Sequence, residues 1–106
     1  MEKLAVIHTA FEDKPSTVAF VDVPEFPTLI EKLEYAYRWT NNVMGSWSRT
    51  DLEDNGDYNP AVTRVAPLHE GGMGLRSTSV GDQILVGNKK YVVAMMGFET
   101  LEGEKI

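Results

Sequence analysis

The sequence contains no cysteine, has few basic residues and has no long apolar run. Without cysteine there is no disulfide, thiol nucleophile or thiolate metal site, which fits a reducing compartment. Ten Lys and Arg stand against 16 Asp and Glu, a net charge of −6. Since nucleic acid is bound largely through Lys and Arg on phosphates, this balance disfavours direct nucleic-acid binding. No segment resembles a signal peptide or a membrane span, so we expect a cytoplasmic protein without a membrane partner.

Catalytic and metal-binding patterns are equally scarce. His8 and His69 lack a second ligand at metal spacing, which favours a hydrogen-bonded structural role for both. No serine lies in a nucleophile elbow. The acidic segment 51–57 resembles a calcium loop only in part, because Val62 stands where the bidentate glutamate is needed. We therefore expect no enzyme activity, no cofactor and no metal site.

The hydrophobic pattern predicts a single domain over residues 1–106. Strands are expected at 3–10, 17–23, 61–66, 83–86 and 90–96. Gly87 and Asn88 suit a tight hairpin turn, and 97–99 has the character of a bulge or strand end. Residues 44–60 form a long loop without periodicity, and the tail 100–106 is expected to fray.

One helix is predicted from Leu29 to Asn41 or Val43. Thr28 and Glu31 form a capping box, in which the hydroxyl accepts from the Glu31 amide and the carboxylate reaches back to the Thr28 amide. The side chains at helical spacing on the core face are Leu29, Ile30, Leu33, Ala36, Tyr37 and Thr40. The order β-β-α-β-β-β predicts an α+β fold, with this single helix packed on a mainly antiparallel sheet of about five strands.

The most unusual segment combines aromatic, basic and acidic residues over positions 35–57. Exposed Trp and Tyr near Arg are typical of interface anchors, and carboxylates give complementarity to a basic target. The candidate partner-binding residues are Tyr35, Trp39, Trp47, Arg49, Asp51, Glu53, Asp54 and Asp57. The alternative is that the aromatic side chains pack beneath the long loop as a satellite of the core.

The segment Gly71–Ser79 is a second candidate site, because glycine-rich backbone can form an anion-binding nest. The residues that would bind an anion are Gly72, Gly74, Arg76, Ser77 and Thr78. The segment is neither a P-loop nor a dinucleotide fingerprint. A flexible turn between strands is the favoured interpretation.

Two stretches carry a resemblance: Leu33–Ser48 (LEYAYRWTNNVMGSWS), and Gly74–Asp82 (GLRSTSVGD) with its continuation to Tyr91–Val93 and Gly97–Phe98. Together they resemble small uncharacterised accessory proteins of tailed bacteriophages of the T7-like podovirus type. The first two predicted strands are not part of the resemblance. It implies expression in the cytoplasm of an infected bacterium and supplies no catalytic residues.

Three functions are compatible with these features. The first is a non-enzymatic phage accessory protein that binds and modulates a host or phage protein. The second is a small-ligand or nucleotide-binding module that uses Gly71–Ser79. The third is a structural virion protein or a self-associating protein, with a homodimer left open because strand edges and aromatics also serve self-association.

Overall fold

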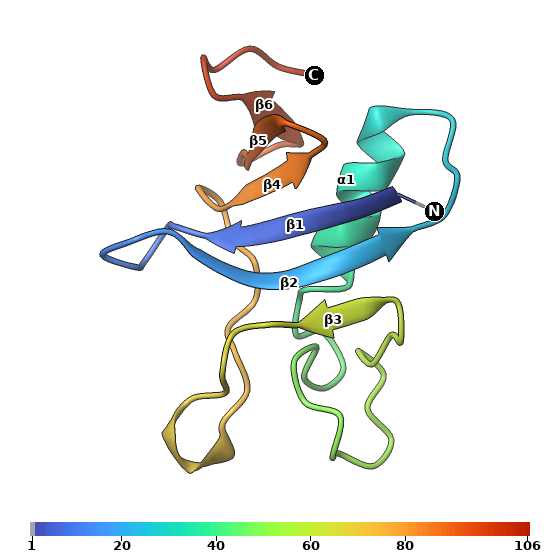
Figure 1. Cartoon of the computed structure of the whole chain (residues 1–106), viewed down its shortest axis with the longest axis vertical. Helices are drawn as coiled ribbons and strands as arrows, with labels where there is room; N and C mark the ends of the chain where they lie inside the picture. The colour runs from blue at the N-terminus through green and yellow to red at the C-terminus, as the bar shows by residue number, and fades with distance from the viewer. Residues whose placement is uncertain (1) are drawn as a thin grey trace.

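The computed structural model, which describes residues 2–106, shows one antiparallel sheet with the helix α1 packed on one face (Figure 1). The elements are β1 Glu2–His8, β2 Ser16–Val23, α1 Leu29–Arg38, β3 Val62–Arg64, the 3₁₀ turn η1 Glu70–Gly72, β4 Gln83–Val86, β5 Lys89–Val93 and β6 Phe98–Thr100. The six strands lie in the order β3-β2-β1-β4-β5-β6. The predicted α+β class is confirmed. The sheet gains a sixth strand because the stretch interpreted as a strand end pairs with β5.

Two glycines set the turns of the C-terminal hairpins. Gly87 has a φ of 62° and follows Val86, which pairs with Lys89, so the predicted two-residue turn is of type II′. Gly97 has a φ of 78°, and its carbonyl accepts from the Ala94 amide at 3.0 Å. This second turn ends β5 at Val93, three residues before the predicted end.

The ends of β1 and β3 also differ from prediction, because their backbone groups find other partners. β1 ends at His8, since the amides of Thr9 and Ala10 donate to the Asp82 carboxylate instead of a strand. β3 is shortened at its C-terminal end, where the amides of Val65 and Ala66 both donate to the Val18 carbonyl. Such convergence on one acceptor breaks the regular ladder.

Helix α1 begins where the sequence predicts and ends early. The Thr28 hydroxyl accepts from the Glu31 amide at 3.2 Å. The Glu31 carboxylate accepts from the Thr28 hydroxyl, at 2.8 Å, and not from its amide as expected. The helix ends at Arg38 because nearby side chains bind its last carbonyls: the Thr40 hydroxyl donates to Ala36, and the Asn41 amide group donates to Tyr37.

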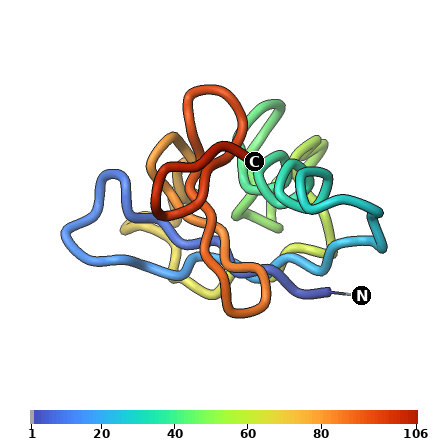
Figure 2. The backbone as a smooth tube through the Cα atoms, turned by 90° about the horizontal axis from the view of Figure 1, so that it is seen from above, coloured from blue at the N-terminus to red at the C-terminus, as the bar shows by residue number. Residues whose placement is uncertain are grey.

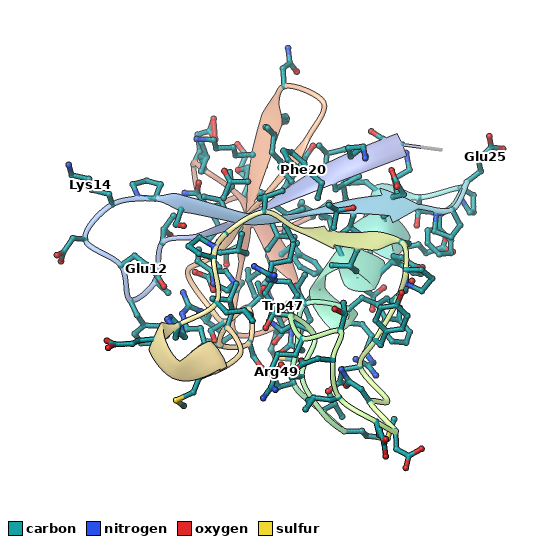
Figure 3. The ribbon with its side chains drawn as sticks, turned by 60° about the horizontal axis from the view of Figure 1, so that its bottom comes forward. Glu12, Lys14, Phe20, Glu25, Trp47 and Arg49 are labelled. Carbon is teal, nitrogen blue, oxygen red and sulfur yellow. The ribbon has the colours of Figure 1, made fainter. Side chains whose placement is uncertain are left out.

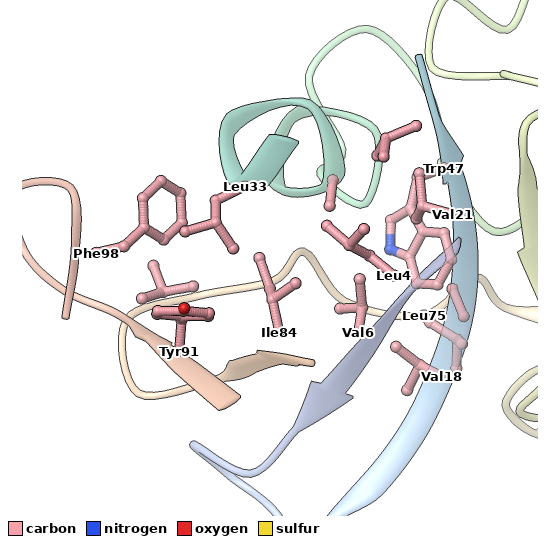
Figure 4. Close-up of a cluster of buried hydrophobic side chains, with 14 residues drawn as sticks. Leu4, Val6, Val18, Val21, Leu33, Trp47, Leu75, Ile84, Tyr91 and Phe98 are labelled. Atoms are coloured by element: carbon pink, nitrogen blue, oxygen red, sulfur yellow. The ribbon is translucent and has the colours of Figure 1, made fainter. Parts of the chain in front are cut away.

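The core lies between α1 and the sheet (Figure 4). Leu33 and Ala36 of the helix are fully buried against strand residues such as Leu4, Val6 and Ile84. Ile30, predicted to face the core, is 40% exposed. It lies on the flank of the helix shared with Glu34, at the edge of the buried stripe, so its side chain meets solvent.

The C-terminal tail turns back along β6. The Thr100 amide donates to the Glu104 carbonyl at 2.9 Å, and the Ile106 amide donates to Phe98 at 3.2 Å. The tail, expected to fray, thus covers the outer edge of β6. β3 forms the opposite edge of the sheet.

Candidate protein-interaction surface

The long loop between α1 and β3 is organised around the carboxylate of Asp57, which is fully buried. Its Oδ2 accepts from the amides of Val43 and Met44 at 2.8 and 2.9 Å. Its Oδ1 lies 3.2 Å from Nη2 of Arg38, at the end of α1. Burial by itself raises the pKa of Asp57, but the two amides and the guanidinium outweigh it, so the pKa falls below its ordinary value.

Asn55 makes a second set of contacts inside the same loop. Its carbonyl oxygen accepts from the amides of Ser46 and Asp57, at 3.0 and 3.1 Å. Its amide nitrogen donates to the carbonyls of Ser46 and Arg49, at 2.7 and 2.8 Å. Because the loop lacks regular secondary structure, these side chains replace the missing backbone hydrogen bonds and specify one path for the chain.

Trp47, a predicted anchor, lies inside the molecule (Figure 3). Its side chain is 4% exposed, its indole N–H donates to the Arg76 carbonyl at 2.9 Å, and its ring forms a T-shaped pair with that of His8. Trp47 is therefore part of the core, which agrees with the alternative that aromatic side chains pack beneath the long loop. Trp47 and the buried Asp57 therefore lie beneath the surface of the molecule.

Tyr35 and Trp39 are half-buried and form an aromatic row with Phe26 along one side of α1. The ring centroids are 5.6 Å apart for Phe26 and Tyr35, and 6.4 Å apart for Tyr35 and Trp39. The Arg38 guanidinium lies 4.2 Å from the centroid of a Trp39 ring, and the Tyr35 hydroxyl accepts from Asn59. The row thus joins the helix to the loop.

Three apolar side chains of the loop extend into solvent where the Asp57 contacts fix the backbone. The exposed fractions are 64% for Val43, 67% for Met44 and 51% for Tyr58. We call these three side chains, together with the half-buried Trp39 that follows α1, the apolar loop surface. The many turn residues around Val43, Met44 and Tyr58 gave no indication in the sequence that these three side chains would be exposed together. The one signal for their exposure was the pair Val43-Met44, two adjacent apolar residues where the helical periodicity ends and no strand pattern begins.

The acidic tip of the loop is formed by Asp51, Glu53 and Asp54; two positions after Asp54, Gly56 lies against the Met44 side chain. Arg49 donates from Nε and Nη2 to the Asp51 carboxylate, at 3.0 and 2.7 Å, and this lowers the pKa of Asp51. Glu53 and Asp54 are exposed, and within residues 2–106 neither forms an ion pair. The opposite charges of Arg49 and Asp51 cancel, so the carboxylates of Glu53 and Asp54 make the local electrostatic potential negative.

The anion-binding candidates are occupied by internal contacts. All five N–H groups of Arg76 are used: they donate to Glu12, to Asp82 and to the Ser77 carbonyl. The Ser77 hydroxyl accepts from the Asn42 amide. The Gly72 amide donates to the His69 carbonyl, and a side chain at Gly74 would meet the hydroxyls of Ser46 and Ser48. Arg76 therefore has no donor left for an incoming phosphate.

Thr78, the remaining anion candidate, belongs to a buried chain of hydrogen bonds. The His8 Nε2 lies 3.0 Å from the Thr78 hydroxyl, which in turn donates to the Thr40 hydroxyl at 2.8 Å. Thr40 donates onward to the Ala36 carbonyl. Since each hydroxyl donates one proton, this order places a proton on Nε2 of His8. The predicted structural role of His8 agrees with this arrangement.

Comparison with protein-family models, with curated proteins and with solved structures finds no match. Among residues 2–106 no helix has the length and apolar character needed to cross a membrane. In the same part of the chain, no group of three or more His, Cys, Asp or Glu side chains is arranged to hold a metal ion.

Proposed function

We propose that this chain is a non-enzymatic accessory protein that acts by binding another protein through the apolar loop surface and the adjoining acidic tip. The resemblance to accessory proteins of tailed bacteriophages supplies the setting, an infected bacterial cytoplasm. The partner is then a host or phage protein whose activity changes on binding.

One observation carries the proposal: the buried Asp57 and the half-buried Asn55 fix a loop whose apolar side chains are exposed to water. The side chains of Asp57 and Asn55 form hydrogen bonds with backbone groups of the loop, and Val43, Met44 and Tyr58 of the same loop are exposed. This exposure does not stabilise the fold, since it is the burial of apolar surface that lowers the free energy. Contiguous exposed apolar surface with a polar rim is typical of sites for protein partners.

The charge of the rim indicates the kind of partner. Glu53 and Asp54 carry exposed negative charge in the same loop as the apolar loop surface. Rim charges steer association and set specificity, so the partner should carry basic residues around an apolar contact. Trp39, with the Arg38 guanidinium stacked on it, supplies the side-chain types that dominate binding energy at interfaces.

Affinity capture from bacterial lysate tests the proposal. Tagged wild-type protein is compared with Val43→Ser/Met44→Ser/Tyr58→Ser, which alters exposed positions only, and with Met73→Ser, an exposed methionine outside the surface. We expect one stoichiometric partner that the triple variant retains roughly tenfold less well and Met73→Ser retains fully. Glu53→Lys/Asp54→Lys should weaken retention most at low salt.

Equal retention by the wild-type protein and the triple variant, or no stoichiometric partner at any salt concentration, would contradict the proposal. A Trp47→Ala variant is unsuitable here, because removing a buried tryptophan costs about 3–5 kcal/mol and disturbs the fold itself.

A further inference from the structure

Two methionines at the β5–β6 turn are the most exposed large apolar side chains described. Met95 is 89% exposed and Met96 is 77% exposed. They occupy the middle of the turn Ala94–Gly97, which lies on the α1 side of the sheet, while the β4–β5 turn lies on the other side (Figure 2). This turn is distinct from the apolar loop surface.

The geometry of the turn explains Gly97 but not the methionines. A positive φ of 78° favours glycine at position 97. The two positions before it have ordinary negative φ, and turns of this kind favour Pro, Asp, Asn or Ser there. Since Met95 and Met96 bury little of their surface, packing within the fold does not explain their apolar character.

Hollows flank the turn on two sides. One, of about 420 Å³, lies between α1 and the hairpin and is lined by residues that include Tyr37, Arg38, Val93, Met95 and Phe98. The other, of about 480 Å³, is lined by residues that include Val80, Val92, Met95, Met96 and Lys105. Met95 lines both hollows and Met96 lines the second, so the two methionines form a ridge between two partly apolar hollows.

The charge around this ridge is mainly negative. Glu34 lines the first hollow and Glu99 the second, while Glu102 and Glu104 lie in the tail that covers β6. Within residues 2–106 none of these four carboxylates forms an ion pair, and Arg38 is already paired with Asp57. Lys105 alone opposes them there. A basic partner is complementary to this rim.

We propose that the Met95–Met96 ridge and its two hollows dock a basic amphipathic helix of another protein. Methionine is unbranched and polarisable, so it adapts to apolar side chains of different shapes, and methionine-rich surfaces bind amphipathic helices in this way. The apolar face of the helix covers Met95 and Met96. Its Lys and Arg residues face Glu34 and Glu99 at the rim.

Methionine-methyl NMR of the full chain tests the inference directly. Protein labelled with [methyl-¹³C]methionine is titrated with a designed Leu/Lys amphipathic peptide of about 18 residues, or about five helical turns. The expected result is saturable movement of the Met95 and Met96 signals, with those of Met44 and Met73 unchanged. A Leu/Glu peptide of the same pattern should bind at least roughly tenfold more weakly.

Variants complete the test. Met95→Ser/Met96→Ser should weaken binding of the Leu/Lys peptide roughly tenfold, and the matched control Met44→Ser/Met73→Ser should not. No movement of the Met95 and Met96 signals, or equal binding of the two peptides, would overturn the inference. So would movement with protein concentration alone, since the occupant would then be a second copy of the chain. Movement confined to Met44 would overturn it while supporting the apolar loop surface.

Discussion

At the scale of single residues, Asp82 links parts of the chain that are far apart in sequence. Its buried carboxylate accepts from the amides of Thr9, Ala10 and Ser79 and forms a two-bond pair with Arg76. Burial by itself raises the pKa of Asp82, but the Arg76 guanidinium and these amides outweigh it and lower the pKa to about 2. This residue fixes the start of the β1–β2 loop against the segment before β4.

The first prediction follows from this geometry. Asp82→Asn should lower the free energy of unfolding by about 3 kcal/mol, because the new amide group would point a donor at Arg76 or Ser79 and leave buried groups unpaired. Urea denaturation at neutral pH measures the change. The matched control, Asp51→Asn, removes the exposed partner of Arg49 and should leave the midpoint unchanged. An equal loss in both variants would contradict the account.

At the scale of elements, α1 owes its start to local sequence, whereas its end combines local side-chain contacts with a long-range one. Thr28 caps the first turn through a contact three residues away. At the other end, the buried Thr40 hydroxyl donates to the Ala36 carbonyl four residues earlier and accepts from the Thr78 hydroxyl, 38 positions distant. The loop that follows α1 also depends on a long-range contact, since the Asp57 carboxylate pairs with Arg38 at the end of the helix.

A second prediction concerns the helix start. Thr28→Ala should destabilise the protein by about 1 kcal/mol, because the Glu31 amide loses its acceptor. Thr28→Ser should restore nearly all of that stability, since serine caps equally well. Thermal and urea denaturation of the three proteins provide the measurement. If serine and alanine had the same effect, the hydroxyl would not be the stabilising group.

At the scale of the whole molecule, the free energy of unfolding should depend on pH through a histidine and several carboxylates whose pKa values differ between the folded and unfolded states. Burial lowers the pKa of His8, only partly opposed by the nearby Asp82 carboxylate. The unfolded chain therefore takes up this proton more readily than the folded protein, and stability falls as the pH drops below about 6.5. The pKa values of Glu12, Asp57 and Asp82 are also lowered, so a further loss begins below about pH 4.

The third prediction separates these two ranges. Between about pH 7.5 and about pH 5, His8→Gln should flatten the decline in the free energy of unfolding, whatever its effect on stability at neutral pH. The control His69→Gln alters an exposed histidine and should keep the wild-type decline. Both variants should still lose stability below about pH 4. An unchanged slope in His8→Gln would show that another group governs the upper range.

The sequence by itself determined the features that depend on neighbours along the chain. The hydrophobic pattern predicted the strands, Thr28 and Glu31 predicted the helix start, and Gly87 with Asn88 predicted a tight turn. Each of these signals acts within a few residues, because dihedral preference and capping are local interactions.

Only the tertiary structure decided the features whose partners lie far away in sequence. Trp47 is buried because it packs in the core and donates to the Arg76 carbonyl, and the Arg76 guanidinium is engaged in part by Glu12, 64 positions earlier. The exposure of Met44, Met95 and Met96 belongs to the same class. A local pattern records that a residue is apolar, whereas the packing of distant segments decides whether it is covered.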